Sequence, residues 1–342
     1  MISMRQHAIS IAAIFLALAI GVVLGSGLLS NGMLSGLRDD KADLQSRIED
    51  LNTTNNQLNE QLTAADGFDS VVSDRIVRDT LAQRSVVVVT TPDADPGEAE
   101  GINRLIGQAG GNVTGRVALT KSFVDSVNGD QLRTTVTNVI PAGIQLRTGA
   151  VDQGSLAGDL LGSVLLLDPQ TAQPQTTPEE RALALDALRG GGFVDFDGNV
   201  APAQFAIVLT GSGDPENTSG NRGAVIARFA AAMDGRGAGA VLVGPPAAAE
   251  GSGPIAVARA DAGVSATLST VDNVDRESGR ITTVLALQEQ LGGGAGRYGT
   301  GPGATSVTVG RRRSSGCGRA TVTPVAPQHV RRARRLREKV LP

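Results

Sequence analysis

Residue types that commonly do chemistry are scarce in this chain. The two histidines are His7 and His329, the one cysteine is Cys317, and residues 68–310 contain neither type. A Ser–His or Cys–His nucleophile pair is therefore excluded from this central region. Soft metal sites use Cys, Met and His, and Met233 is the single such residue between 68 and 310. The composition thus predicts no catalytic, cofactor-binding or metal-ligating residue there.

Carboxylates are the remaining groups that could carry acid–base catalysis. Two candidate pairs are Asp152 with Asp159 and Asp272 with Asp275. Solvated loop acids and helix N-caps are far commoner roles for such residues, so we expect these four to be structural. We therefore predict that the protein is not an enzyme and needs no cofactor, and carboxylate chemistry is the one catalytic route left open.

Two further features could hold a ligand by their position. Residues 299–303, Gly-Thr-Gly-Pro-Gly, resemble a phosphate-binding loop, but they lack lysine and contain a proline, so a flexible turn is the preferred interpretation. Thr91 with Asp93, and Gly211 with Ser212, follow two apolar runs directly. Ligands of open α/β sheets bind beyond the carboxyl ends of strands, so these residues mark the position expected for one.

The elements that position these residues alternate between strand-like and helix-like patterns. Strands are expected at residues 85–90, 112–120, 193–196, 205–210, 240–243, 255–258 and 281–287. Helices are expected at residues 71–82, 98–108, 130–138, 159–167, 181–189 and 223–233, and Gly67 is expected to end the helix before them. Apolar strands alternating with helices predict a mostly parallel, layered α/β domain over residues 67–309.

Residues 9–29 form an uncharged, almost wholly apolar run of 21 residues. About 20 helical residues cross the hydrocarbon core of a bilayer, so the run predicts a single transmembrane helix. The alternative is a cleaved signal peptide, whose apolar region is usually about 7 to 15 residues long. The length of this run favours an uncleaved anchor. Arg5 precedes the run, and the positive-inside rule then places residues 1–8 in the cytoplasm and the bulk of the chain outside it.

The net charge of −3 combines two regions of opposite sign. Residues 311–342 hold ten basic residues and one acidic residue, whereas residues 1–310 carry a net charge of −12. An acidic body is a poor nucleic-acid binder, so no nucleic-acid partner is expected. The tail over residues 310–342 has no apolar periodicity with which to fold. We expect it to be disordered or to result from a shifted reading frame, and a basic arm is the alternative.

Residues 30–66 carry a heptad repeat. Its a positions are Leu34, Lys41, Ile48, Asn55 and Leu62, and its d positions are Leu37, Leu44, Leu51, Leu58 and Ala65. This alternating spacing of three and four favours a coiled-coil stalk, and a lone amphipathic helix on the domain is the alternative. Leucine at d with one asparagine at a favours a parallel two-stranded coil. We therefore predict a parallel homodimer held by Leu37, Leu44, Ile48, Leu51, Asn55, Leu58 and Leu62.

Five segments of the chain resemble one known family. They are residues 1–27, VDQGSLAGDLLG at residues 151–162, ARFAAAM at 227–233, STVDNVDRESGRIT at 269–282 and RYGTGPGATSVTV at 297–309. The segments resemble the actinobacterial MctB family, which also includes SteB-like cell-division proteins. They occur in the same order over residues 1–309, so the resemblance covers almost all of the chain and leaves out the basic tail.

The resemblance implies two possible roles. MctB-type proteins imply copper transport or efflux and copper homeostasis in the cell envelope, with a channel-like role in the outer membrane. SteB-like members imply the alternative, a single-pass scaffold that pairs through a coiled coil and acts with a partner membrane protein in cell division and control of cell-wall hydrolysis. No metal residue is carried over from the family. We expect a membrane-anchored envelope protein with a copper-related role, and a divisome partner under the alternative.

Overall fold

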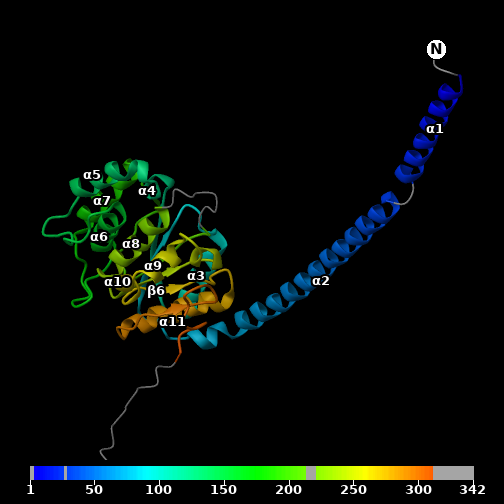
Figure 1. Cartoon of the computed structure of the whole chain (residues 1–342). Helices are drawn as coiled ribbons and strands as arrows, with labels where there is room; N and C mark the ends of the chain where they lie inside the picture. The colour runs from blue at the N-terminus through cyan, green and yellow to red at the C-terminus, as the bar shows by residue number, and fades with distance from the viewer. Residues whose placement is uncertain (1–3, 27–28, 213–220, 311–342) are drawn as a thin grey trace, which may run out of the picture. The chain divides into compact units, whose positions relative to one another are not determined.

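The computed structural model describes residues 4–26, 29–212 and 221–310, and the side chains of residues 24–38 lie outside that description. Helix α1, Met4–Ser26, contains residues 9–26 of the apolar run (Figure 1), residues 27–28 lie outside the described residues, and Leu29 is the first residue of the next helix. Its window Met4–Val23 has a mean hydropathy of 2.1 and none of it is buried, which suits a bilayer span by length and composition. The expected apolar N-terminal helix is confirmed, but it begins earlier than residue 9.

Helix α2, Leu29–Val77, continues through Gly67, so the prediction that Gly67 ends it is wrong. Glycine ends helices by adopting a positive φ, and Gly67 does not do so. Contacts on both sides of Gly67 keep the helix intact. Before it, Asp66 pairs with Arg276 at 2.9 Å, and beyond it Val77 is fully buried. The helix ends before Asp79, whose φ is 60°.

In the described part of the chain, one seven-stranded sheet has the order β3-β2-β1-β4-β5-β6-β7. The strands are β1 Ser85–Thr90, β2 Asn112–Leu119, β3 Val194–Phe196, β4 Phe205–Leu209, β5 Gly239–Val243, β6 Ser269–Val271 and β7 Arg297–Tyr298. Every neighbouring pair is parallel except β2 with β3. The mostly parallel α/β sheet predicted from the sequence is confirmed.

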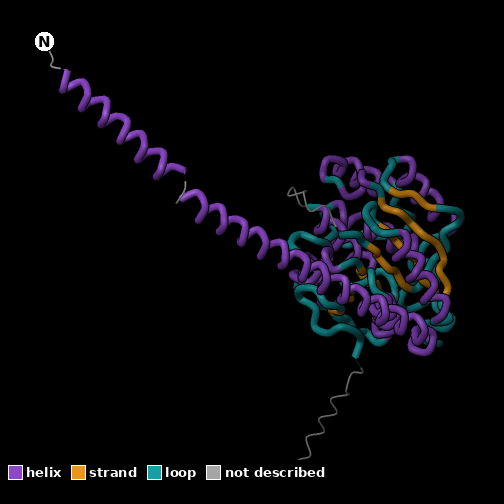
Figure 2. The backbone as a smooth tube through the Cα atoms, turned by 90° about the vertical axis from the view of Figure 1, so that its right-hand side faces the viewer, coloured by secondary structure: helices purple, strands orange, loops and turns teal. Residues whose placement is uncertain are grey.

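Helices cover both faces of this sheet (Figures 1 and 2). They are α3 Pro96–Gln108, α4 Lys121–Val124, α5 Gly129–Asn138, α6 Gln153–Leu165, α7 Pro178–Gly190, α8 Arg222–Asp234, α9 Pro254–Ala260, α10 Ala262–Ser265 and α11 Glu277–Leu291, with 3-10 turns at Ser126–Asn128 and Pro246–Ala249. The end of α2 packs with α3 and α11 on one face, while α6, α8 and α9 pack on the other. We call the described residues from 78 to 309 the head.

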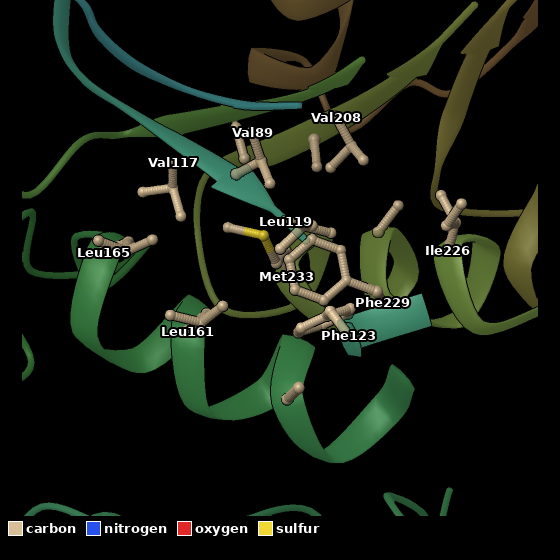
Figure 3. Packing of buried hydrophobic residues seen from close by; sticks show 14 of the residues in the cluster. Val89, Val117, Leu119, Phe123, Leu161, Leu165, Val208, Ile226, Phe229 and Met233 are labelled. Carbon is tan, nitrogen blue, oxygen red and sulfur yellow. The ribbon is translucent and has the colours of Figure 1, made fainter. Parts of the chain in front are cut away.

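Two hydrophobic cores lie on the two faces of the sheet. Val86 and Val88 of β1 point into the core under α3 and α11, and Val87 and Val89 point into the core under α6 and α8. Figure 3 shows the second core, where Phe123 packs edge-to-face on Phe229 with ring centroids 5.4 Å apart. A four-residue apolar run fits a strand only when both faces are covered, which explains the three layers.

Two strand predictions are wrong, because residues 255–258 lie in α9 and residues 281–287 lie in α11. Pro254 occupies the first turn of α9, where its missing N–H leaves no hydrogen bond unmade. In α11 the hydroxyls of Thr282 and Thr283 donate to carbonyls one turn earlier, so these β-branched residues fit a helix. Strands β6 and β7 were not predicted, since they have only three and two residues.

A buried ion pair joins β6, α9 and the glycine-rich loop. Arg259 Nη1 donates to Asp272 Oδ2 at 2.5 Å, and both side chains are almost fully buried. The backbone N–H groups of Thr300 and Gly301 donate to Asp272 Oδ1 at 2.7 and 2.9 Å. Gly299 has a φ of 125°, and a Cβ there would lie 2.1 Å from that oxygen. The expected turn is present, and the anion that its N–H groups bind is the protein's own carboxylate.

Substitution of Asp272 tests this pair. Asp272→Asn leaves Arg259 buried without its counter-charge, so the free energy of unfolding is expected to fall by about 3–5 kcal/mol. The control Asp130→Asn removes the exposed partner of Arg133 and is expected to change stability negligibly. Urea denaturation of the full chain in detergent, followed by circular dichroism, measures both variants. Equal, small changes in the two would contradict the structural role of the buried pair.

Candidate functional site

The strand order places the switch point of the sheet between β1 and β4. The chain leaves β1 for β2 on one side and returns to β4 on the other side. In open α/β sheets ligands bind outside the carboxyl ends of the strands at such a point. Thr91 and Asp93 follow β1, and Gly211 follows β4. The structure therefore brings these sequence-predicted residues together at the switch point.

Thr91 links the two strand ends by hydrogen bonds. Its Oγ1 donates to Asp93 Oδ1 at 2.5 Å and accepts a bond from the Gly211 backbone N–H at 3.4 Å. A Cβ on Gly211 would lie 1.9 Å from the Asp93 carbonyl oxygen, so the two loops leave no room for a methyl group. Ser212 is exposed. The described residues at this point, Thr91, Asp93 and Gly211, therefore bind one another.

Glu98 is a buried acid in the first turn of α3, close to this edge of the sheet. Asp95 caps the helix by accepting the Glu98 backbone N–H at 3.0 Å. The Glu98 side chain is 8% exposed, and its Oε2 has no hydrogen-bond partner among the described residues. Burial, followed by the charges of Asp95 and Asp275, raises the pKa of Glu98 to about 7, and Arg280 opposes the shift. Glu98 can therefore exchange a proton near neutral pH.

Sequence reasoning did not single out Glu98, and no local signal identifies it. An acidic residue in the first turn of a helix usually interacts with the helix dipole in solvent. Here the packing of α3 against α11 buries the carboxyl group, and that contact joins residues far apart in the chain. A proton-exchanging group is not by itself a catalytic site, since catalysis also needs a positioned reacting partner.

The carboxylates considered for catalysis each contact a separate structural partner. Asp152 caps α6 by accepting the backbone N–H groups of Gly154 and Ser155. Asp159 is buried and accepts Arg236 Nε at 2.6 Å. Asp272 pairs with Arg259 as described above, and Asp275 lies 3.6 Å from Arg276 Nε. The cap role predicted from the sequence holds for Asp152, whereas Asp159 and Asp272 are fully buried in ion pairs, a role that the sequence did not predict.

No group of three or more His, Cys, Asp and Glu side chains is arranged to hold a metal ion within the described residues. The head also contains no cysteine or histidine with which to bind a soft metal ion. The absence of a resident metal and of catalytic activity both stay predictions.

The predicted oligomerisation residues share one helix. Leu44, Ile48, Leu51, Leu58 and Leu62 are 59, 57, 68, 52 and 43% exposed on the single chain, and Asn55 is exposed with them. The Asn59 amide donates to Asn55 Oδ1 at 3.4 Å. Leu37 lies on α2, but its side chain is outside the description. The described part of α2 thus presents a row of apolar side chains to solvent.

Comparison with known proteins relates the whole described chain to one family. The family model described as "Copper transport outer membrane protein, MctB" matches residues 1–309. The chain is 48% identical over 313 residues to the Copper transporter MctB of Mycobacterium tuberculosis, which covers 90% of this chain and 99% of that protein. It is 50% identical over 316 residues to the Copper transporter MctB of Mycobacterium leprae, with the same two coverages. The family match ends where the basic tail begins.

The raised pKa of Glu98 predicts a pH-dependent stability. The folded state holds this proton more tightly than the unfolded chain does. The contribution of Glu98 to the free energy of unfolding is therefore greatest below pH 4.5 and is lost as the pH rises through about 7. Glu98→Gln is expected to remove this part of the slope and to stabilise the protein at pH 8 by on the order of 2 kcal/mol.

The control for this prediction is Glu100→Gln on the same helix, where the exposed carboxylate pairs with Arg116. It is expected to leave the slope in that pH range unchanged. Urea unfolding at a series of pH values between 4 and 8 checks both variants. Burial also raises the pKa of Asp234 to about 6, so part of the slope is expected to remain in Glu98→Gln. A slope identical to that of the wild type would contradict the assignment to Glu98.

Proposed function

This chain belongs to the MctB family, and from that membership we propose that it takes part in copper transport and copper homeostasis in the cell envelope. The observation that carries the proposal is that one family match spans the apolar helix, α2 and the head together. Copper is proposed as cargo of the assembled protein. The proposed location is a membrane of the envelope, with the N-terminus in the cytoplasm and the head outside it.

The chemistry of the head limits how copper is handled. Cu(I) prefers thiolate, thioether and imidazole ligands, and among these the head offers the side chain of Met233. Met233 is fully buried in the core, packed near Phe229 (Figure 3). We therefore propose that the head does not capture copper tightly. Copper would pass through an assembly in which the head has a structural, non-catalytic role.

The exposed apolar row on α2 supports a parallel homodimer. A fully buried leucine contributes about 1.5–3 kcal/mol relative to an exposed one, so pairing of these rows recovers substantial free energy. Both chains enter the membrane through the helix at the same end, which requires them to run parallel. In that arrangement the two Asn55 side chains face each other and satisfy one another's hydrogen bonds. The same pairing brings two α1 helices together. This pairing matters for transport because a single apolar helix cannot enclose a pore on its own.

A scaffold role in cell division is a second candidate function. It is favoured by the described residues of the switch point, where Thr91 binds the Gly211 N–H and no room remains for a methyl group on Gly211. On this proposal the head docks an envelope partner protein, and the helix α2 sets its distance from the membrane. Both candidate functions use the same dimer.

Two substitutions on α2 test the dimer. Leu51→Asp places a charge in the proposed seam and is expected to convert the protein to monomers, whereas Asn55→Leu is expected to tighten the dimer or change its oligomeric state. The control Thr53→Asp adds the same charge at an outward position of the heptad and is expected to leave the dimer intact. Chemical cross-linking and light scattering in detergent measure the outcome. A monomeric wild-type protein would contradict the coiled-coil proposal.

Deletion of the gene tests the copper role. The deletion strain is expected to accumulate cell-associated copper and to become more sensitive to added copper, and the wild-type gene is expected to restore both. Complementation with Leu51→Asp is expected to fail, while Thr53→Asp is expected to succeed. Normal copper content and tolerance in the deletion strain, together with misplaced septa, would favour the scaffold role instead.

A further inference from the structure

Arg181 is a buried cation whose guanidinium has no hydrogen-bond or ion-pair partner among the described residues. It lies in the first half of α7 and is 8% exposed. The buried Arg259 pairs with Asp272, and the partly buried Arg236 pairs with Asp159. The guanidinium group of arginine is cationic and presents its N–H donors in a planar fork.

The adjacent acid on α7 is already engaged. Glu180 Oε2 accepts the Thr177 backbone N–H at 3.0 Å and so completes the capping box of the helix. Its Oε1 accepts the Ala142 backbone N–H at 3.1 Å. These two bonds lower the pKa of Glu180 and keep its carboxylate in place. Glu180 therefore satisfies backbone groups and leaves the charge of Arg181 uncompensated.

Arg181 lines a groove of about 280 Å³ between α7 and residues 196–200. Leu185 and the ring of Phe196 provide apolar surface in the same groove. The second arginine there, Arg189, is held by the protein, because it lies over the Phe196 ring 3.3 Å from its centroid and donates to the Phe196 carbonyl oxygen. Arg181 is thus the cation of the groove whose donors remain unused.

We propose that this groove binds a small carboxylate, with Arg181 donating to both of its oxygens. The planar guanidinium fork matches two coplanar carboxylate oxygens. The charged lining residues are Arg181, Arg189 and Asp186, whose net charge of +1 matches a monoanion better than a phosphate dianion. The surfaces of Leu185 and Phe196 suit a carboxylate attached to an apolar body. The proposal goes beyond the copper role and does not depend on it.

Calorimetric titration of the full-length protein in detergent tests the proposal. Sodium benzoate is expected to bind in the millimolar range, whereas benzamide, the uncharged analogue of similar shape, is expected not to bind. The dipeptide Ala-Ala with a free or an amidated C-terminus shows whether a peptide carboxylate is also accepted. Arg181→Lys is expected to weaken benzoate binding at least about tenfold, and Arg181→Leu to abolish it. The control Arg116→Leu removes an exposed arginine and is expected to bind like the wild type.

The temperature of thermal unfolding gives a second readout. Loss of a purely structural arginine would lower this temperature, which is the opposite of the change expected here. Without ligand, Arg181→Leu is expected to unfold at the same or a higher temperature, because the guanidinium makes no hydrogen bond or ion pair among the described residues that the substitution would remove. Benzoate is expected to raise the unfolding temperature of the wild type alone. A lower unfolding temperature of Arg181→Leu, tighter binding of inorganic phosphate than of the carboxylates, or no carboxylate binding by the wild type would each overturn the proposal.

Discussion

The head depends on one strand that is buried on both of its faces. Four consecutive valines of β1 alternate between two cores, so neither core forms unless helices cover both faces of the sheet. The strand also lies at the switch point, with β2 on one side and β4 on the other. The layers, the strand order and the packing of the end of α2 against the head therefore follow from burying the same short apolar run.

Elements with long or strongly apolar local patterns were predictable from the sequence. Very short strands, and features that depend on tertiary contacts, were not. The apolar N-terminal helix was predictable from its length, and the strands at residues 85–90 and 205–210 were predictable from short apolar runs followed directly by turn residues. The segment 281–287 failed because a run of β-branched residues does not distinguish a strand from a buried helix. The helix end at Gly67 failed because a glycine can end a helix only where no distant contact holds it, and Asp66 and Val77 supply such contacts.

The positions of the candidate site residues were predictable from the sequence, but their contacts were not. The sequence located Thr91 and Gly211 at the strand ends, yet only the packed structure shows that Thr91 binds the Gly211 N–H and that Gly211 lies against the Asp93 carbonyl oxygen. The glycine-rich loop at residues 299–303 does bind an anion through backbone N–H groups, but the anion is Asp272. Glu98 and Arg181 look like ordinary helix-surface residues in the sequence. Their burial results from contacts between elements, which no local spacing encodes.

The proposed dimer and the chemistry of the head together determine where copper selectivity can arise. A head without cysteine or histidine cannot distinguish copper from other divalent ions by ligand softness. The sulfur and imidazole side chains outside it are Met1, Met4 and His7 in the N-terminal region, Met33 in α2, and Cys317 and His329 in the tail. In a parallel dimer the two N-terminal regions are adjacent, so each ligand is present twice around one axis. On this proposal, selection of copper falls to the paired membrane segments and their partners, and α2 holds those segments together.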